Sequence, residues 1–275
     1  MGKTKLMLAY QCQGDPRAPA IVLLHGFLGS KEDWSRVTEV LAEHYYCICI
    51  DLPGHGSSHQ HTLTTPGFSD CVALIQQTLS SLTVQQYHLV GYSLGGRIAL
   101  HLARQSPEQV QSLILESCHP GLTSYADKAA RKANDAQWAA KLASLTILDF
   151  LAQWYQQPVF ADLSPQKRQV MIKLRSSNNA IALGNCYQST SLAEQADLWD
   201  TPAIIKAPCY FIAGDDDQKF TALATRWQQQ STIKLHVAEG CGHNVHSAAP
   251  ALFSQLVLQL IQPQLPSSPS DNRAI

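Results

Sequence analysis

Short, continuously apolar runs alternate with amphipathic, helix-like stretches along the first 120 or so residues of the chain. Such runs, bounded by glycine, aspartate or other polar residues, are typical of strands buried on both faces. They occupy residues 20–24, 45–50, 87–91 and 112–116, and the helix-like stretches occupy about 33–43, 67–82 and 94–105. Strands that alternate with helices predict an α/β fold with a mostly parallel central sheet flanked by helices on both faces.

The hydrophobic pattern of the sequence changes between residues 119 and 197, where strand-like runs stop. This segment is rich in Ala, Gln and Leu at helical spacing, and it carries eight Lys and Arg against six Asp and Glu. We therefore predict a modestly basic helical insertion. Strand-like runs return at 207–214 and 233–240, with helices expected at about 221–230 and 248–261. The predicted organisation is a core of 1–118 and 198–262, an insertion of 119–197, and a disordered Pro/Ser-rich tail at 263–275.

Composition excludes several classes of protein. With 275 residues, of which 45% are hydrophobic, the chain can bury a sizeable core. A net charge of −1 without a dense basic run argues against a nucleic-acid partner. No apolar stretch approaches the roughly 20 residues that a membrane span needs, and no signal peptide is visible, so we expect a cytoplasmic protein without membrane insertion. The eight cysteines form no C-x-x-C pair, and we expect them to be buried thiols in a reducing compartment.

The segment Gly91–Gly96, which reads GYSLGG, follows one of the predicted strands and precedes an apolar helix. G-x-S-x-G in this strand–turn–helix context is typical of a nucleophilic serine on a strained turn. Glycines are needed there because a Cβ at position 91 or 95 would collide with the adjoining strand and helix. The pattern alone also fits an ordinary strand–helix turn. Its context favours Ser93 as a nucleophile or base, with the N–H of Leu94 as an oxyanion donor.

Further motifs follow other predicted strands. His25-Gly26-Phe27 is where a second oxyanion donor, the N–H of Phe27, is expected. The Asp51–Gly56 loop predicts a structural role for its histidine. A run of three aspartates, 215–217, offers an acid, and His243 offers a base, with His246 as a rival that we expect to be a surface or lining residue. The order Ser, Asp, His along the chain is that of α/β-hydrolases.

The chain resembles the α/β-hydrolase superfamily over essentially residues 15–262, and the resemblance implies that the acid is Asp217 and that 119–197 form a helical lid. The strings LHGFLGS, DLPGHG, GYSLGGR, HPGL, WYQQPVF, LRSSNN and GHNVH are similar to one branch in particular, the MenH family. Members of this family are 2-succinyl-6-hydroxy-2,4-cyclohexadiene-1-carboxylate synthases of menaquinone biosynthesis. They are carbon–oxygen lyases that remove a proton α to a carbonyl and expel an enolpyruvyl group as pyruvate.

The resemblance also implies a set of substrate-binding residues. Guanidinium groups bind carboxylates through paired hydrogen bonds, which suits a polycarboxylate substrate. The family pattern places arginines that bind these carboxylates at Arg97, Arg131 and Arg175, and it places pocket-lining aromatic residues at Trp154 and Tyr155. Tyr92 of the serine turn is expected to add a hydrogen bond or an aromatic wall.

Two other functions share the core motifs. A carboxylesterase or carbon–carbon bond hydrolase would use the same serine, histidine and aspartate with an attacking water. A non-enzymatic binding protein of the same fold is disfavoured, because all three residues are present. We see no metal-ligand spacing and expect no metal and no cofactor. The expected partner is a small polycarboxylate, and the family tendency predicts a monomer or weak homodimer.

Overall fold

The computed structural model describes residues 7–261, and its centre is a seven-stranded sheet in the order β1-β3-β2-β4-β5-β6-β7. Only β1 runs antiparallel to its neighbour, and the other strands are parallel to one another. The strands are β1 Tyr10–Gln13, β2 Ala20–Leu24, β3 Tyr46–Ile50, β4 Tyr87–Tyr92, β5 Val110–Glu116, β6 Cys209–Gly214 and β7 Lys234–Ala238. The predicted α/β fold with a mostly parallel sheet is confirmed, and the edge strand β1 is an addition that the sequence did not predict.

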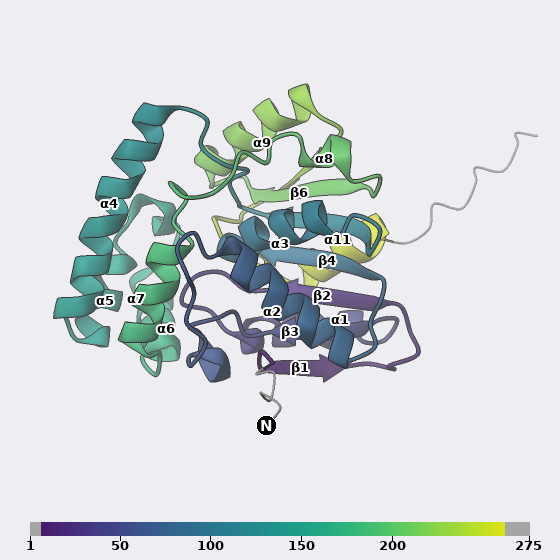
Figure 1. Ribbon diagram of the computed structural model, residues 1–275, viewed down its shortest axis with the longest axis horizontal. Helices are drawn as coiled ribbons and strands as arrows, with labels where there is room; N and C mark the ends of the chain where they lie inside the picture. Colours follow the sequence, from purple (N-terminus) through teal and green to yellow (C-terminus); the bar gives the residue numbers. More distant parts are fainter. Residues whose placement is uncertain (1–6, 262–275) are drawn as a thin grey trace, which may run out of the picture.

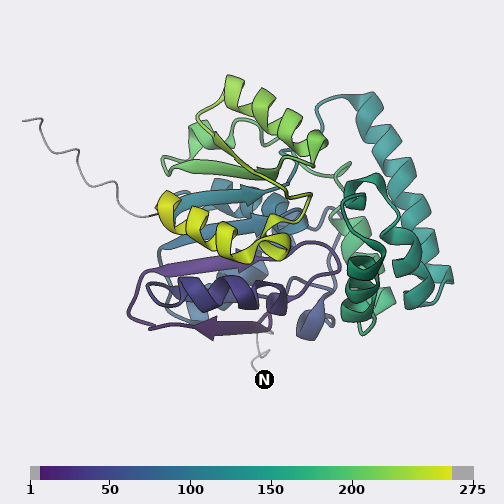
Figure 2. The same ribbon diagram turned by 180° about the vertical axis from the view of Figure 1, so that it is seen from behind.

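Helices cover both faces of this sheet (Figures 1 and 2). One face carries α2 Phe68–Ser81, α3 Leu94–Gln105, α8 Thr201–Ile204 and α9 Gln218–Gln230. The other face carries the 3₁₀ helix η1 Lys31–Trp34, together with α1 Ser35–Leu41, α10 Val245–Ala248 and α11 Pro250–Ile261. A short 3₁₀ helix, η2 Gly56–Ser58, lies in the loop after β3. The expected final helix at about 248–261 corresponds to α11, and the short helix α10 before it was not predicted. The tail at 263–275 lies outside the described residues.

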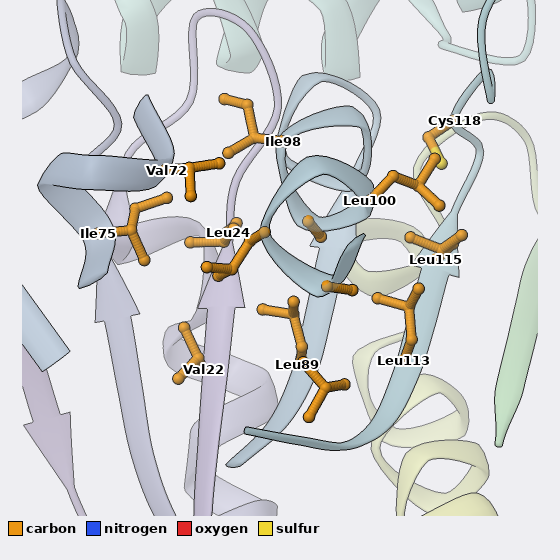
Figure 3. Packing of buried hydrophobic residues seen from close by; sticks show 14 of the residues in the cluster. Val22, Leu24, Val72, Ile75, Leu89, Ile98, Leu100, Leu113, Leu115 and Cys118 are labelled. Atoms are coloured by element: carbon orange, nitrogen blue, oxygen red, sulfur yellow. The ribbon is translucent and has the colours of Figure 1, made fainter. Parts of the chain in front are cut away.

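Alternate residues of the buried strands supply two apolar layers. In β2, Val22 and Leu24 pack with α2 and α3, as Figure 3 shows, whereas Ile21 and Leu23 pack with α1 and α11. Successive side chains of a strand point to opposite faces, so a strand covered on both sides must be apolar throughout. This explains why the strands are continuous apolar runs. Full burial of each such side chain contributes roughly 1.5–3 kcal/mol of stabilisation, which fixes the strands that carry the site.

The predicted insertion, residues 119–197, forms four helices, α4 Tyr125–Ser144, α5 Ile147–Trp154, α6 Pro165–Arg175 and α7 Ala180–Ser189, with the 3₁₀ helix η3 Pro158–Phe160. These helices lie together at the end of the sheet where the parallel strands finish (Figure 1). They have a small apolar cluster of their own, which includes Phe150 and Leu183.

The two ends of this helical segment lie side by side. The N–H of Leu198 donates to the carbonyl of Pro120 (2.8 Å), which closes the base of the segment. Gly121 adopts a φ of 122°, and a Cβ there would run into the carbonyl oxygen of Ala196. Only glycine suits this position, because the backbone is left-handed and the two chain segments approach closely. The chain therefore leaves and rejoins the core at one narrow neck.

No helix among residues 7–261 is long and apolar enough to cross a membrane.

Candidate active site

Ser93 occupies a strained turn between β4 and α3, with φ 49° and ψ −106°. A Cβ at Gly95 would run into the backbone at the end of β2, and a Cβ at Gly91 would lie 2.6 Å from the carbonyl oxygen of Gly95. Close backbone contacts at both positions thus explain why glycine is needed there, as predicted. The turn holds the serine at the start of helix α3, where unpaired backbone N–H groups favour negative charge.

His243 and Asp217 form a buried hydrogen-bonded pair. The Nδ1–H of His243 donates to Asp217 Oδ2 (2.7 Å), and both side chains are more than nine-tenths buried. Because Nδ1 carries the proton, Nε2 is left with a lone pair that can accept the proton of a hydroxyl. The rings of Tyr92 and Phe220 pack around the imidazole, with centroids 5.4 and 4.9 Å away. No hydrogen bond joins His243 to Ser93 among the described residues, a looseness that is common before a substrate binds.

The aspartate run after β6 divides into different roles. Asp217 is the N-cap of helix α9, where its Oδ1 accepts the N–H of Phe220 (3.3 Å). Asp215 instead accepts the N–H of Cys241 (3.2 Å), and the N–H of Asp216 donates to the carbonyl of Cys241 (3.0 Å). These bonds tie the acid loop to the loop that carries the histidine. Of the three aspartates, Asp217 is the one that the structure places against His243.

The loop that presents the expected oxyanion donor Phe27 is fixed by two buried histidines. His25 Nε2 accepts the N–H of Leu52 (3.0 Å), and His55 Nε2 accepts the N–H of Leu28 (3.1 Å). A backbone N–H can only donate, so both rings must be neutral with the proton on Nδ1. Burial lowers the pKa of His55 to about 3, and burial also lowers the pKa of His25. His55 thus has the structural role that the sequence predicted.

Leu94, the second expected donor, is the first residue of α3, so its N–H has no acceptor within the helix. The ring of Phe27 packs between Trp154 and Tyr187, at centroid distances of 5.1 and 4.9 Å. The helical segment therefore rests on the loop that carries Phe27.

Two cavities lie beside these residues. The inner cavity, of about 30 Å³, is lined by Gly26, Phe27, Gly29, Asp33, Tyr92, Trp154, Tyr155, Phe160, Met171, Arg175 and Asn244. The outer cavity, of about 1190 Å³, lies between η1, α6 and the loop of His243, and it is lined in part by Lys31, Arg36, Lys167 and His246. Pockets for small molecules have volumes of roughly 300–1000 Å³, so only the outer cavity is large enough for a ring-sized molecule.

Arg175 is the one predicted arginine that lines these cavities, and it lines both. Its Nη1 and Nη2 donate to the two carboxylate oxygens of Asp33, at 2.6 and 2.7 Å. Its side chain is 10% exposed. The predicted aromatic residues Tyr92, Trp154 and Tyr155 line the inner cavity as well.

Arg97 and Arg131 lie elsewhere. Arg97 donates to the carbonyl of Thr190 (2.7 Å), and Arg131 donates through Nε to Asp135 (2.7 Å). Neither lines the two cavities above. Burial, and next the charge of Arg131, lower the pKa of Arg97 to about 10. Asp135, the partner of Arg131, acts in the opposite direction and raises the pKa of Arg97.

Lys219 belongs to the same cationic group and was missed by the sequence reasoning. Burial and then Arg131 lower its pKa, whereas Asp217 raises it. Burial first, and then Lys219, Arg97 and Arg131, lower the pKa of His119 to about 4. The position of Lys219, two residues after the acid, was the available signal.

A second buried histidine–carboxylate pair confirms only part of one expectation. His246 was expected to be a surface or lining residue, but it is 1% exposed and its Nδ1 lies 2.6 Å from Glu116 Oε2. The N–H of His246 donates to the other oxygen of Glu116 (3.0 Å). The imidazole stacks on Trp34 and meets the edge of Tyr92. His246 does line the outer cavity, but its main contacts fasten the His243 loop to the end of β5.

No group of three or more His, Cys, Asp or Glu side chains that could hold a metal ion occurs among the residues that the structure describes.

Comparison with known proteins agrees with this geometry. The serine turn and the Asp–His pair at the ends of parallel strands define an enzyme of the α/β-hydrolase type, and the family model described as alpha/beta hydrolase fold matches residues 19–250. The chain is 38% identical over 259 residues to the 2-succinyl-6-hydroxy-2,4-cyclohexadiene-1-carboxylate synthase of Salmonella agona, covering 94% of this chain and 99% of that protein. The synthase of Enterobacter sp. is 39% identical over 256 residues, covering 93% and 96%. The chain therefore belongs to the family of 2-succinyl-6-hydroxy-2,4-cyclohexadiene-1-carboxylate synthases within the α/β-hydrolase fold.

Solved structures lead to the same family. MenH from S. aureus matches with a TM-score of 0.83 and 27% identity, over 92% of this chain and 97% of that one. A hydrolase from Pseudomonas aeruginosa matches with a TM-score of 0.76 at 21% identity, over 93% and 94% of the two chains, and this likeness bears on the fold alone.

Proposed function

We propose that the protein is a carbon–oxygen lyase that eliminates pyruvate from 2-succinyl-5-enolpyruvyl-6-hydroxy-3-cyclohexene-1-carboxylate in menaquinone biosynthesis. The observation that carries this proposal is the 38% identity to a named synthase over 94% of the chain. The serine turn and the Asp217–His243 pair supply the chemistry that such an elimination needs.

The reaction begins with proton transfer from the hydroxyl of Ser93 to Nε2 of His243. The resulting alkoxide removes a proton α to the succinyl carbonyl, and the N–H groups of Phe27 and Leu94 stabilise the enolate oxygen. The electron pair then forms a ring double bond next to the succinyl group, the existing ring double bond shifts towards the carbon that carries the enolpyruvyl group, and the carbon–oxygen bond to that group breaks. The imidazolium returns its proton to the leaving group, which departs as pyruvate. Asp217 stabilises the imidazolium and keeps its orientation.

We infer that the substrate carboxylates bind to arginines on two sides of the serine. Arg175 lines the inner cavity on one side, and the cations Arg97, Arg131 and Lys219 form the other. Tyr92, Trp154 and Tyr155 provide the wall against which the ring lies. The helices of 119–197 then serve as a lid, which must shift because the inner cavity is far too small for the substrate.

We also infer a cytoplasmic enzyme that works as a monomer or weak homodimer. The eight cysteines are free thiols, seven of them buried, which suits a reducing compartment.

The test is release of pyruvate from the enolpyruvyl substrate, measured with coupled lactate dehydrogenase. We expect turnover by the unaltered protein and a loss of at least about 10³-fold in kcat for Ser93→Ala, because the hydroxyl of Ser93 supplies the base that removes the substrate proton. A folded protein without pyruvate release would contradict the proposal.

A serine hydrolase is the second candidate, favoured by the same strained serine and buried Asp–His pair. It predicts rapid hydrolysis of p-nitrophenyl esters and covalent labelling of Ser93 by fluorophosphonates. A lyase site lined by cations turns over such neutral esters slowly.

A further inference from the structure

The ion pair between Arg175 and Asp33 joins two distant parts of the chain. Arg175 is the last residue of α6, and Asp33 belongs to η1 on the core, 142 positions earlier. Each terminal nitrogen of the guanidinium donates to one carboxylate oxygen of Asp33, at 2.6 and 2.7 Å. This is the geometry in which a guanidinium binds any carboxylate, whether it belongs to the protein or to a ligand.

The pair stands between the two cavities. Asp33 and Arg175 are among the residues that line the outer cavity, and both line the inner one as well. Tyr155, Phe160 and Asn244 share this property. The outer cavity is also lined by His243, and the ion pair lies where this cavity adjoins the inner one, whose lining includes Tyr92.

Asp33 occupies the end-on edge of the guanidinium, which is the edge formed by Nη1 and Nη2. Both terminal nitrogens of Arg175 donate to Asp33, and its Nε is buried without a hydrogen-bond partner among the described residues. Asp33, in contrast, has another partner, since its Oδ2 also accepts the N–H of Ser30 (3.3 Å). Asp33 is 16% exposed and faces the outer cavity, so water can solvate its carboxylate when a ligand carboxylate replaces it on Arg175.

We propose that Asp33 is a specificity-determining residue. Its carboxylate occupies the position on the Arg175 guanidinium at which a ligand carboxylate would bind, until a ligand carboxylate replaces it. The idea rests on the proposed function, because it assigns Arg175 to a substrate carboxylate. A neutral ligand cannot displace Asp33, since the exchange would leave a buried guanidinium unpaired. Access to the inner cavity thus depends on the charge of the ligand as well as on its shape.

The test uses succinate, a simple dicarboxylate, titrated into the full-length protein by calorimetry. We expect Asp33→Asn and Asp33→Ala to bind succinate about fivefold to tenfold more tightly than the unaltered protein, because the competing carboxylate is gone. Asp33→Glu keeps a competitor and should bind like the unaltered protein. Succinamide, the neutral analogue, should gain nothing in any variant.

The matched control is Asp15→Asn, which changes the net charge equally but removes an exposed carboxylate paired with Arg17. It should leave succinate binding unchanged. The double variant Asp33→Asn/Arg175→Gln should lose the gain, which assigns it to Arg175. Thermal unfolding midpoints confirm that the variants are folded.

Equal or weaker succinate binding by both Asp33→Asn and Asp33→Ala, or no measurable binding by any of these proteins, overturns the idea and makes Asp33 a residue that merely orients Arg175. The pyruvate assay keeps this result separate from the reaction itself. Tighter succinate binding without pyruvate release supports the role of Asp33 and refutes the lyase. Pyruvate release without tighter succinate binding supports the lyase and refutes the role of Asp33.

Discussion

At the scale of single residues, the expected catalytic side chains depend on buried partners that lie far away along the chain. Ser93 and His243 each follow a recognisable strand, so their meeting at one edge of the sheet could be expected. The side-chain pairs that hold the site, Arg175–Asp33 and His246–Glu116, join residues 142 and 130 positions apart. No local pattern encodes such a pairing, because charged residues at these positions fit a solvated surface equally well.

Asp217 offers a test of the proton relay. In Asp217→Asn the amide cannot stabilise the imidazolium and favours the wrong tautomer of His243. We expect kcat to fall by about 10³- to 10⁴-fold while the fold is kept. Pyruvate release measures the loss, and Asp216→Asn, which lacks the contact with His243, is the control and should stay near the activity of the unaltered protein. Comparable losses in both variants would argue against Asp217 as the acid.

Glu116 offers a test of the second histidine pair. Its carboxylate is fully buried and accepts two hydrogen bonds from His246. Removal of one partner from a buried pair costs about 3–5 kcal/mol. We expect Glu116→Gln to lower the free energy of unfolding in urea by about 3 kcal/mol. Glu108→Gln, at an exposed position, should change it by less than about 0.5 kcal/mol. Equal stability of the two variants would show that the buried pair is dispensable.

At the scale of elements, the long buried strands and α3 were predictable, whereas β1 was not. The strand Tyr10–Gln13 has only four residues, it is largely exposed, and it lacks a continuous apolar run. Its pairing with β3 comes from the tertiary fold. The sequence also predicted helices at 119–197, but their packing depends on aromatic contacts such as Trp138–Trp154 that no period in the sequence specifies.

Arg97 tests how α3 and the helical segment cooperate. It reaches from α3 to the carbonyl of Thr190, just after α7, and it belongs to the cationic group inferred to bind the substrate. We expect Arg97→Ala to reduce kcat/KM for the enolpyruvyl substrate by about 10- to 100-fold, since it removes a buried, charge-assisted donor. The control is Arg104→Ala on the same helix, where the lost partner is the exposed Asp200. An Arg97 variant with unaltered kcat/KM would remove this residue from the proposed site.

At the scale of the whole molecule, acid should unfold the protein through its buried neutral histidines. Burial lowers the pKa of His55 to about 3 and the pKa of His101 to about 4, whereas unfolded histidines titrate near 6.5. Below pH 6.5 the unfolded state therefore binds more protons than the folded state, so stability falls as the pH falls towards 4. Each such histidine contributes up to about 1.4 kcal/mol per pH unit.

Thermal unfolding measured from pH 7.5 to 4.5 checks this expectation. The midpoint should drop steadily below pH 6.5. His55→Gln should show a shallower slope than the unaltered protein, whereas His59→Gln, at an exposed position, should not. A midpoint that does not change between pH 6.5 and 4.5 would contradict the assignment of neutral buried rings.

Because Pro120 and Leu198 lie side by side, the segment between them can be replaced as one piece. Recombination that cuts the gene at these two codons would move the whole set of helices without breaking a strand or separating Ser93, Asp217 and His243, all of which stay with the recipient. Arg131, Trp154 and Arg175 would travel together. Asp33 and Arg97 would stay with the core, so an exchanged segment keeps its ligand preference only in a recipient that offers the same two partners.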